Sequence, residues 1–169
     1  MAKKKKTQET GSLSLETILF NCREYLRSNA SLNDKRDLLL TLVFLRFIGE
    51  KFEDEQQKLR QQCIDNGLTD EEMIQAYLDQ PGMYSGIAFV PREARWDYLM
   101  LQPANKLNGA LDDALQALEN GGGSLKGCVR LGLFSSINLE ANVIKKVMDE
   151  VNKISHKVFG TERDLIDGV

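Results

Sequence analysis

The fold is decided by residues 35–48, which read Lys35-Arg-Asp-Leu-Leu-Leu-Thr-Leu-Val-Phe-Leu-Arg-Phe-Ile48. Apolar side chains recur here every three or four residues, the spacing that places them on one side of an α-helix. They cover two adjoining faces, one with Leu38, Leu42, Leu45, Ile48 and Phe52 and the other with Leu39, Val43 and Phe47. A helix that is apolar over so much of its circumference is buried on several sides, so we expect it in the middle of a helical bundle.

The residues on either side of this stretch predict where the helix begins and ends. Asn33 or Asp34 can cap its N-terminus, because their side-chain oxygens accept hydrogen bonds from free backbone N–H groups. Beyond Phe52 the sequence turns polar, and the pair Asn66-Gly67 is typical of a helix C-terminus. We therefore predict one long helix whose polar second part lies in solvent.

Further helices are predicted before and after this central one. An apolar stripe at helical spacing predicts a first helix with Leu15, Ile18, Leu19, Cys22 and Leu26 on one side. A capping box at residues 69–72 starts another helix that runs to about Gln80. Pro91 then begins a helix over residues 92–99. Asn105 caps a helix with Leu107, Leu111, Leu115 and Leu118 inward, and Asn138 caps a last helix that ends at Gly160. Residues 87–90, and the irregular residues 125–134, leave open one or two very short strands. The predicted fold is mainly α, an irregular helical bundle.

Length and composition are those of one globular domain. The chain has 169 residues, 42% of them hydrophobic and 28% charged, and it contains no apolar run long enough to cross a membrane. No signal peptide is recognisable, so we expect a cytoplasmic protein. We divide the chain into a basic tail (residues 1–12) that is disordered when alone, a helical domain (13–160) and the start of a connection to a further domain (161–169).

The charge is unevenly distributed along the chain. Lys3, Lys4, Lys5 and Lys6 give the tail its basic character, whereas the rest carries 18 basic and 24 acidic residues, a net charge of −6. An autonomous nucleic-acid-binding domain usually has a basic face, so any DNA contact of the body is local or shared with other subunits. The four lysines can bind phosphates, but a solubilising tail and a cloning remnant are alternatives.

The residues that usually carry catalysis or bind metals are scattered. Cys22, Cys63 and Cys128 are far apart, and no nearby Ser, Cys or acid motif indicates that His156 is a catalytic base. The triple glycine 121–123 follows a helix, whereas phosphate-binding loops follow a strand. The acidic clusters at residues 53–55 and 70–72 are typical of solvated helix surfaces. We predict no catalytic, cofactor-binding or metal-binding residue in this chain.

Arg92, Arg95 and Trp96 form the most distinctive group of candidate contact residues. If residues 92–99 form one helix, Arg92 and Arg95 lie on the same face and can bind a phosphate or a carboxylate together. Ion pairs with Glu93 or other acids are the structural alternative. For Trp96 we expect packing of this short helix against the bundle.

Four segments, in this order, resemble a known family. They are Leu38-Leu-Leu-Thr-Leu-Val-Phe-Leu-Arg-Phe-Ile-Gly-Glu-Lys-Phe-Glu-Asp54, Val90-Pro-Arg-Glu-Ala-Arg-Trp-Asp-Tyr-Leu99, Asn105-Lys-Leu-Asn-Gly-Ala-Leu-Asp-Asp-Ala-Leu-Gln-Ala-Leu-Glu119 and Arg163-Asp-Leu-Ile-Asp-Gly-Val169. Together they are similar to the N-terminal helical domain of the modification (methyltransferase) subunit of type I restriction-modification enzymes. The resemblance covers residues 13–169. It departs modestly at the end, where relatives usually have Leu-Leu-Gly-Arg-Val.

The resemblance implies a parent enzyme that methylates adenine N6 in DNA with S-adenosylmethionine. It also implies a complex with a specificity subunit, a second modification subunit, a restriction subunit and double-stranded DNA. The catalytic Asn-Pro-Pro-aromatic motif and the Phe-x-Gly-x-Gly cofactor loop of that family are absent here, since Pro81, Pro91 and Pro103 each stand alone. We therefore expect a non-catalytic domain that helps clamp DNA and assemble subunits, with the cofactor bound in a separate domain. A free-standing helical scaffold or adaptor that binds proteins is the alternative.

Overall fold

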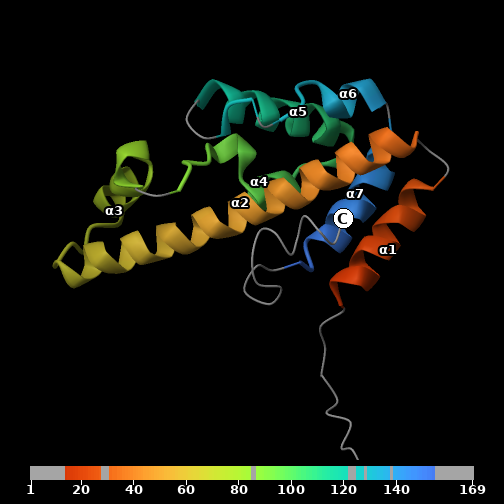
Figure 1. Cartoon of the computed structure of the whole chain (residues 1–169). Helices are drawn as coiled ribbons and strands as arrows, with labels where there is room; N and C mark the ends of the chain where they lie inside the picture. The colour runs from red at the N-terminus through yellow and green to blue at the C-terminus, as the bar shows by residue number, and fades with distance from the viewer. Residues whose placement is uncertain are drawn as a thin grey trace, which may run out of the picture.

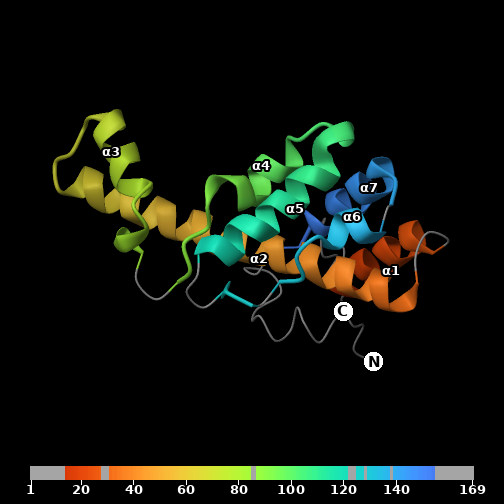
Figure 2. The same ribbon diagram turned by 90° about the horizontal axis from the view of Figure 1, so that it is seen from above.

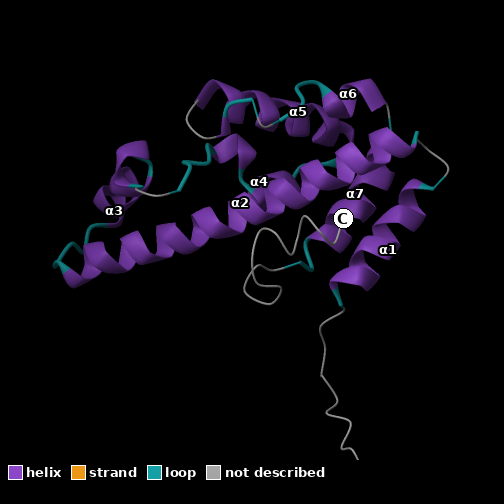
Figure 3. Ribbon diagram, viewed as in Figure 1, coloured by secondary structure: helices purple, strands orange, loops and turns teal. Residues whose placement is uncertain are grey.

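The computed structural model describes residues 14–27, 31–84, 87–121, 125–127, 129–137 and 139–154. Its α-helices are α1 (Leu15–Leu26), α2 (Leu32–Asp65), α3 (Glu71–Leu78), α4 (Trp96–Met100), α5 (Ala104–Gly121), α6 (Leu133–Ile137) and α7 (Ala141–Val151), with 3-10 turns η1 (Pro81–Met83) and η2 (Arg92–Ala94). Figure 3 shows helices and connecting loops, and no strand occurs in these ranges. The mainly α fold is confirmed, and residues 87–90 form no strand.

The long helix α2 is the centre of the structure, as its two apolar faces predict. In Figure 1, α5 and α6 lie on one side of α2 and α1 lies on the other. Figure 2, the view from above, shows these helices and α7 gathered along the part of α2 that lies away from α3. Helix α7 packs against α1, α2 and α5 and closes the bundle. The residues of both predicted faces are buried except Ile48, which is partly exposed.

Helix α2 begins slightly earlier in the chain than predicted. Ser31, rather than Asn33 or Asp34, is the capping residue. Its Oγ accepts a hydrogen bond from the Asp34 backbone N–H (3.2 Å) and donates one to the Asp34 carboxylate (2.8 Å). Asp34 is thus the third residue of a helix that the Ser31 side chain caps. At the other end Asn66 is the C-cap and Gly67 has φ +86°, which confirms the predicted terminus.

Other helix ends also differ from the prediction. Helix α3 is capped by Asp70 and not by Thr69, because the Asp70 carboxylate accepts from the N–H groups of Glu72 and Met73. Helix α5 begins at Ala104, so Asn105 lies inside it, and α7 ends at Val151 instead of Gly160. Asn138, Val158 and Gly160 lie outside the described residues.

Helix α6 was not predicted and lies partly in a segment that we expected to be irregular. The Asp112 carboxylate on α5 accepts from the backbone N–H groups of Phe134 and Ser135, both at 3.0 Å, and from the Ser135 hydroxyl. These N–H groups belong to the first turn of α6, where a helix has no internal acceptors. A carboxylate more than twenty residues away in sequence therefore starts this helix.

Trp96, at the start of α4, contacts both α2 and the residue that follows α7. A Cβ placed on Gly49 of α2 would lie only 3.0 Å from the Trp96 Cβ and 3.2 Å from its backbone nitrogen. The indole is 3% exposed, and its Nε1–H donates to Asn152 Oδ1 (2.8 Å) just beyond α7. The expected packing of Trp96 against the bundle is confirmed.

The C-terminal part of α2 extends beyond the bundle and carries α3. Residues 53–84, which we call the arm, have a separate small core of Leu59, Ile74 and Leu78. In Figures 1 and 2, α3 lies at the far end of α2, apart from the other helices. Arg60 Nη1 on α2 pairs with Glu71 Oε1 on α3 at 2.5 Å and helps hold the two helices together. The polar second part predicted for the central helix is therefore the stem of a projecting arm.

The close contact between α2 and α4 predicts that Gly49→Ala lowers the free energy of unfolding. Overpacking a core costs about 1–3 kcal/mol, whereas alanine gains at most about 1 kcal/mol over glycine inside a helix. Gly109→Ala on α5 is the matched control, because a Cβ there has no neighbour within 4 Å, and it should stabilise the protein. Urea unfolding measures both variants, and a Gly49→Ala protein as stable as Gly109→Ala would contradict the described contact.

Candidate functional site

The segment around Arg95 was the strongest sequence candidate, and the structure changes its geometry. Residues 92–99 do not form one helix: η2 ends at Ala94, Arg95 has an extended backbone (φ −73°, ψ 136°), and α4 starts at Trp96. Arg92 and Arg95 therefore do not share a helical face, and that prediction is wrong. Arg92 is exposed, while Arg95 is partly buried.

Arg95 is held by backbone and aromatic groups. Its Nε donates to the Val90 carbonyl oxygen (3.1 Å), and its guanidinium carbon lies 5.0 Å from the Phe52 ring centre and 5.9 Å from that of Phe89. A guanidinium over an aromatic face is attracted by the ring's quadrupole. The ion pair with Glu93 that we considered for Arg95 is not among these interactions, and its contact with a phosphate stays a prediction.

The rings around Arg95 connect the arm to the bundle. Tyr84 lies 4.7 Å from Phe52 and 5.7 Å from Phe89, centre to centre, and its hydroxyl donates to the Leu78 carbonyl (2.5 Å). Tyr84 packs against both the main core and the small core of the arm. We call Phe52, Tyr84, Phe89 and Arg95 the aromatic joint. Burial raises the pKa of the Tyr84 hydroxyl, so it stays protonated and keeps donating at neutral pH.

A pocket of about 500 Å³ opens beside the aromatic joint, between α2 and α4. Charges of both signs line it, from Arg46, Glu53, Arg95 and Asp97. Arg46 is also engaged, since its Nε donates to the Ile154 carbonyl (3.1 Å). A lining of this kind selects neither an anion nor a cation, and we assign it no ligand.

The titratable groups with shifted pKa values lie mainly where α1 meets α7. Burial, and then the nearby Glu150 charge, raise the pKa of the Cys22 thiol to about 12, so it is unreactive at neutral pH. The Glu150 carboxylate accepts from Lys153 Nζ (2.8 Å) and Asn21 Nδ2 (3.3 Å), and the Lys153 hydrogen bond lowers its pKa although burial opposes this. This group ties α1 to α7 and has no nucleophile–base geometry.

Several other candidates are now placed. Cys22 and Cys63 are free thiols, whereas Cys128, His156 and Lys3 to Lys6 lie outside the described residues. Within the described ranges no cluster of His, Cys, Asp and Glu is suited to hold a metal ion. Across the same ranges, no helix has the length and apolar character that crossing a membrane requires.

Sequence reasoning missed the structural roles of Arg95, Asp112 and Asn152. Each contacts groups distant in the chain, and a single polar residue gives no sequence signal of such a partner.

Comparison with known proteins gives one family match. A family model described as the HsdM N-terminal domain matches residues 15–151, which is more than half of the chain. The match spans α1 through α7 and includes both the bundle and the arm. No curated protein matches the sequence.

The aromatic joint predicts different effects for the two arginines. Arg95→Ala should lower the free energy of unfolding by about 1–3 kcal/mol, because it removes the ring contacts and leaves the Val90 carbonyl without its donor. Arg92→Ala, at an exposed position, should change it by less than about 0.5 kcal/mol. Thermal and urea unfolding measure the difference. Equal effects would show that Arg95 does not hold the joint.

The lowered pKa of Glu150 predicts an acid-sensitive contact between α1 and α7. A carboxylate with a lower pKa in the folded state adds stability above its unfolded pKa of about 4.5, and this stability is lost as pH falls through the folded pKa. Glu150→Gln should therefore lose less stability than the wild type between about pH 6 and about pH 3. Urea unfolding at both pH values tests this, and parallel losses would be inconsistent with it.

Proposed function

Because the chain belongs to the HsdM N-terminal domain family, the N-terminal domain of the modification subunit of type I restriction-modification enzymes, we propose that it is a non-catalytic clamp and assembly domain. It helps the modification subunit close around double-stranded DNA. It also contributes contacts to the specificity subunit, the second modification subunit and the restriction subunit. Since such an enzyme acts on DNA, we place it in the cytoplasm.

The observation that carries this proposal is that the distinctive polar and indole side chains make contacts inside the fold. Arg95, Trp96 and Asp112 hold elements of the bundle in place, and Glu150 joins α1 to α7. A catalytic site instead needs a nucleophile, base or metal that can reach a substrate. The arrangement supports a rigid body that positions other parts of an enzyme.

The charge distribution supports DNA contact on the bundle side of the molecule. Residues 53–84 alone carry a net charge of −6, so residues 13–52 and 85–169 together are balanced, with sixteen charges of each sign. The lysine tail precedes α1, which belongs to the bundle. We propose that Lys3–Lys6 and the exposed Arg92 bind DNA phosphates, because cations near DNA release its condensed counterions.

The cofactor of the parent enzyme does not fit the described residues. Dinucleotide- and nucleoside-type cofactors are usually held by a glycine-rich turn between a strand and a helix, where backbone N–H groups face the ligand. The described ranges contain no strand, and Gly121 ends a helix. We propose that S-adenosylmethionine binds in another domain of the modification subunit.

A free-standing protein-binding scaffold is the second candidate. It is favoured by the acidic arm, which suits a protein partner better than DNA. The two candidates differ in their DNA dependence: a clamp contributes phosphate contacts to the assembled enzyme, whereas a scaffold contributes none.

Salt dependence of DNA binding separates these candidates in the complex of the full-length modification subunit with its specificity subunit. Replacing Lys3–Lys6 by alanine should weaken binding and reduce the slope of log K against log salt by up to about 3–4, since each phosphate contact contributes about 0.9. Lys58→Ala on the arm is the control and should leave the slope unchanged, because Lys58 pairs with Glu55.

Two results would contradict the proposal. An unchanged slope in the tail variant would remove the proposed DNA contact. Methyl transfer from S-adenosylmethionine to DNA by the 169-residue chain alone would show that the domain is catalytic.

A further inference from the structure

The arm differs from the bundle in its charge. Residues 53–84 contain eight acidic and two basic residues, and both basic side chains already pair with carboxylates of the arm. Lys58 pairs with Glu55, and Arg60 pairs with Glu71. The whole net negative charge of residues 13–169 is thus concentrated on a projection that Figure 1 shows apart from the other helices.

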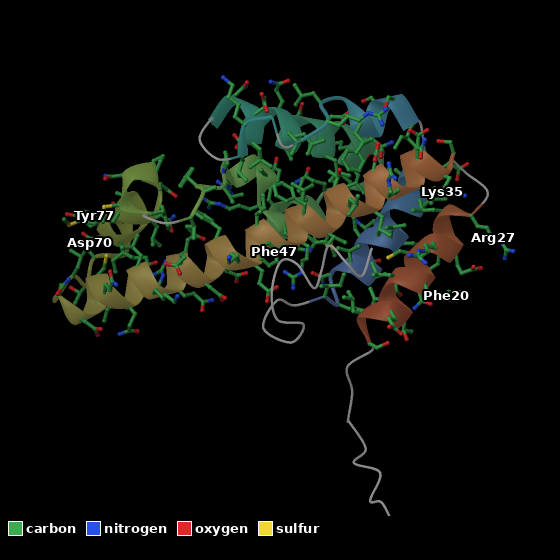
Figure 4. All side chains as sticks on the ribbon, in the orientation of Figure 1. Phe20, Arg27, Lys35, Phe47, Asp70 and Tyr77 are labelled. Carbon is green, nitrogen blue, oxygen red and sulfur yellow. The ribbon has the colours of Figure 1, made fainter. Side chains whose placement is uncertain are left out.

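Helix α3 exposes two large apolar side chains on one side. Ile74 and Leu78 point into the small core of the arm, at 2% and 3% exposure. Met73 and Tyr77 lie one helical turn apart on α3 and are 50% and 40% exposed. Figure 4 shows Tyr77 and the helix cap Asp70 at the end of the arm that lies farthest from the bundle. Met73 and Tyr77 therefore form an apolar strip that the small core does not use.

Acidic residues lie at both ends of α3, the helix that carries this strip. Glu71 and Glu72 occupy the first turn of α3, Asp70 caps it, and Asp79 follows its last residue. Phosphate-rich DNA and anionic lipid headgroups would be repelled by this surface. Two copies of the arm placed face to face would also bring like charges together. A protein surface with the opposite charge has none of these costs.

We propose that the Met73–Tyr77 strip is a docking site for a protein surface that presents an apolar patch flanked by lysine or arginine. The strip supplies apolar area that becomes buried, and the excess negative charge of the arm attracts and orients the partner. Tyr and Met are enriched at protein interfaces, and Tyr77 keeps a polar hydroxyl at its tip. This inference deepens the assembly role proposed above and rests on it for its biological setting, whereas the binding itself is measurable on the chain alone.

The test uses two fluorescent helical peptides with the same leucine stripe, one with lysine and the other with glutamate on its polar face. We expect the 169-residue chain to bind the lysine peptide, with an affinity that falls as salt rises, and not the glutamate peptide. Met73→Ser/Tyr77→Ser should weaken binding about tenfold or more. Because both side chains are exposed, circular dichroism should show an unchanged helical content.

The matched control is Phe20→Ser/Leu101→Ser, which removes two exposed apolar side chains from the bundle at 59% and 83% exposure. Phe20 lies on α1, far from the arm (Figure 4). This variant should bind the lysine peptide like the wild type. Amide NMR shifts caused by the peptide should concentrate in residues 71–79.

Several results would overturn the inference. They are no binding of the lysine peptide, equal binding of both peptides, or equal affinities of the arm and control variants. Equal affinities close to that of the wild type would indicate charge attraction alone, and equal losses would indicate unspecific apolar association. A dimer of the wild-type chain in sedimentation that Met73→Ser/Tyr77→Ser dissociates would identify a second copy as the occupant instead. The salt dependence of DNA binding by the lysine-tail variant is measured independently of peptide binding to the arm. Failure of this inference is therefore distinguishable from failure of the proposed function.

Discussion

The approach of Trp96 to Gly49 is the contact on which the rest of the structure depends. With only a hydrogen at Gly49, the backbone of α4 lies directly on α2, and a methyl group there would leave 3.0 Å to the Trp96 Cβ. The indole N–H then reaches Asn152 at the end of α7. One close contact thereby sets the position of α4 on α2 and links both to the helix that closes the bundle.

Beyond Phe52, α2 leaves the bundle and enters the arm, where the balance of charges changes. Residues 13–52 and 85–169 are together charge-balanced, whereas the arm carries the excess negative charge of residues 13–169 as well as the Met73–Tyr77 strip. The aromatic joint connects them through Tyr84, whose ring packs against both cores. This division suits a domain with two kinds of neighbour: DNA near the bundle and lysine tail, and a protein at the arm.

Sequence periodicity predicted most of the helices because it depends on local spacing. The two apolar faces of α2 and the Asn66-Gly67 terminus are examples. Local reasoning failed where a distant group decides the conformation: Arg95 interrupts the predicted helix to meet Phe52 and Phe89, and Asp112 starts α6. In the candidate site, Trp96 packs as expected. The prediction that Arg92 and Arg95 share a helical face was wrong, because it assumed a continuous helix over residues 92–99. The sequence showed the acidic composition of the arm, but it gave no sign that the arm projects from the bundle.

The central claim, that a rigid bundle presents its arm to a protein partner, is tested most directly by amide hydrogen exchange in the full-length modification subunit, free and assembled with its specificity subunit and a second modification subunit. The account predicts that assembly slows exchange in α3 (Glu71–Leu78), while the α2–α4 contact around Gly49 and Trp96 is equally protected in both states. Unchanged exchange in α3, or protection around Gly49 that appears only on assembly, would contradict it.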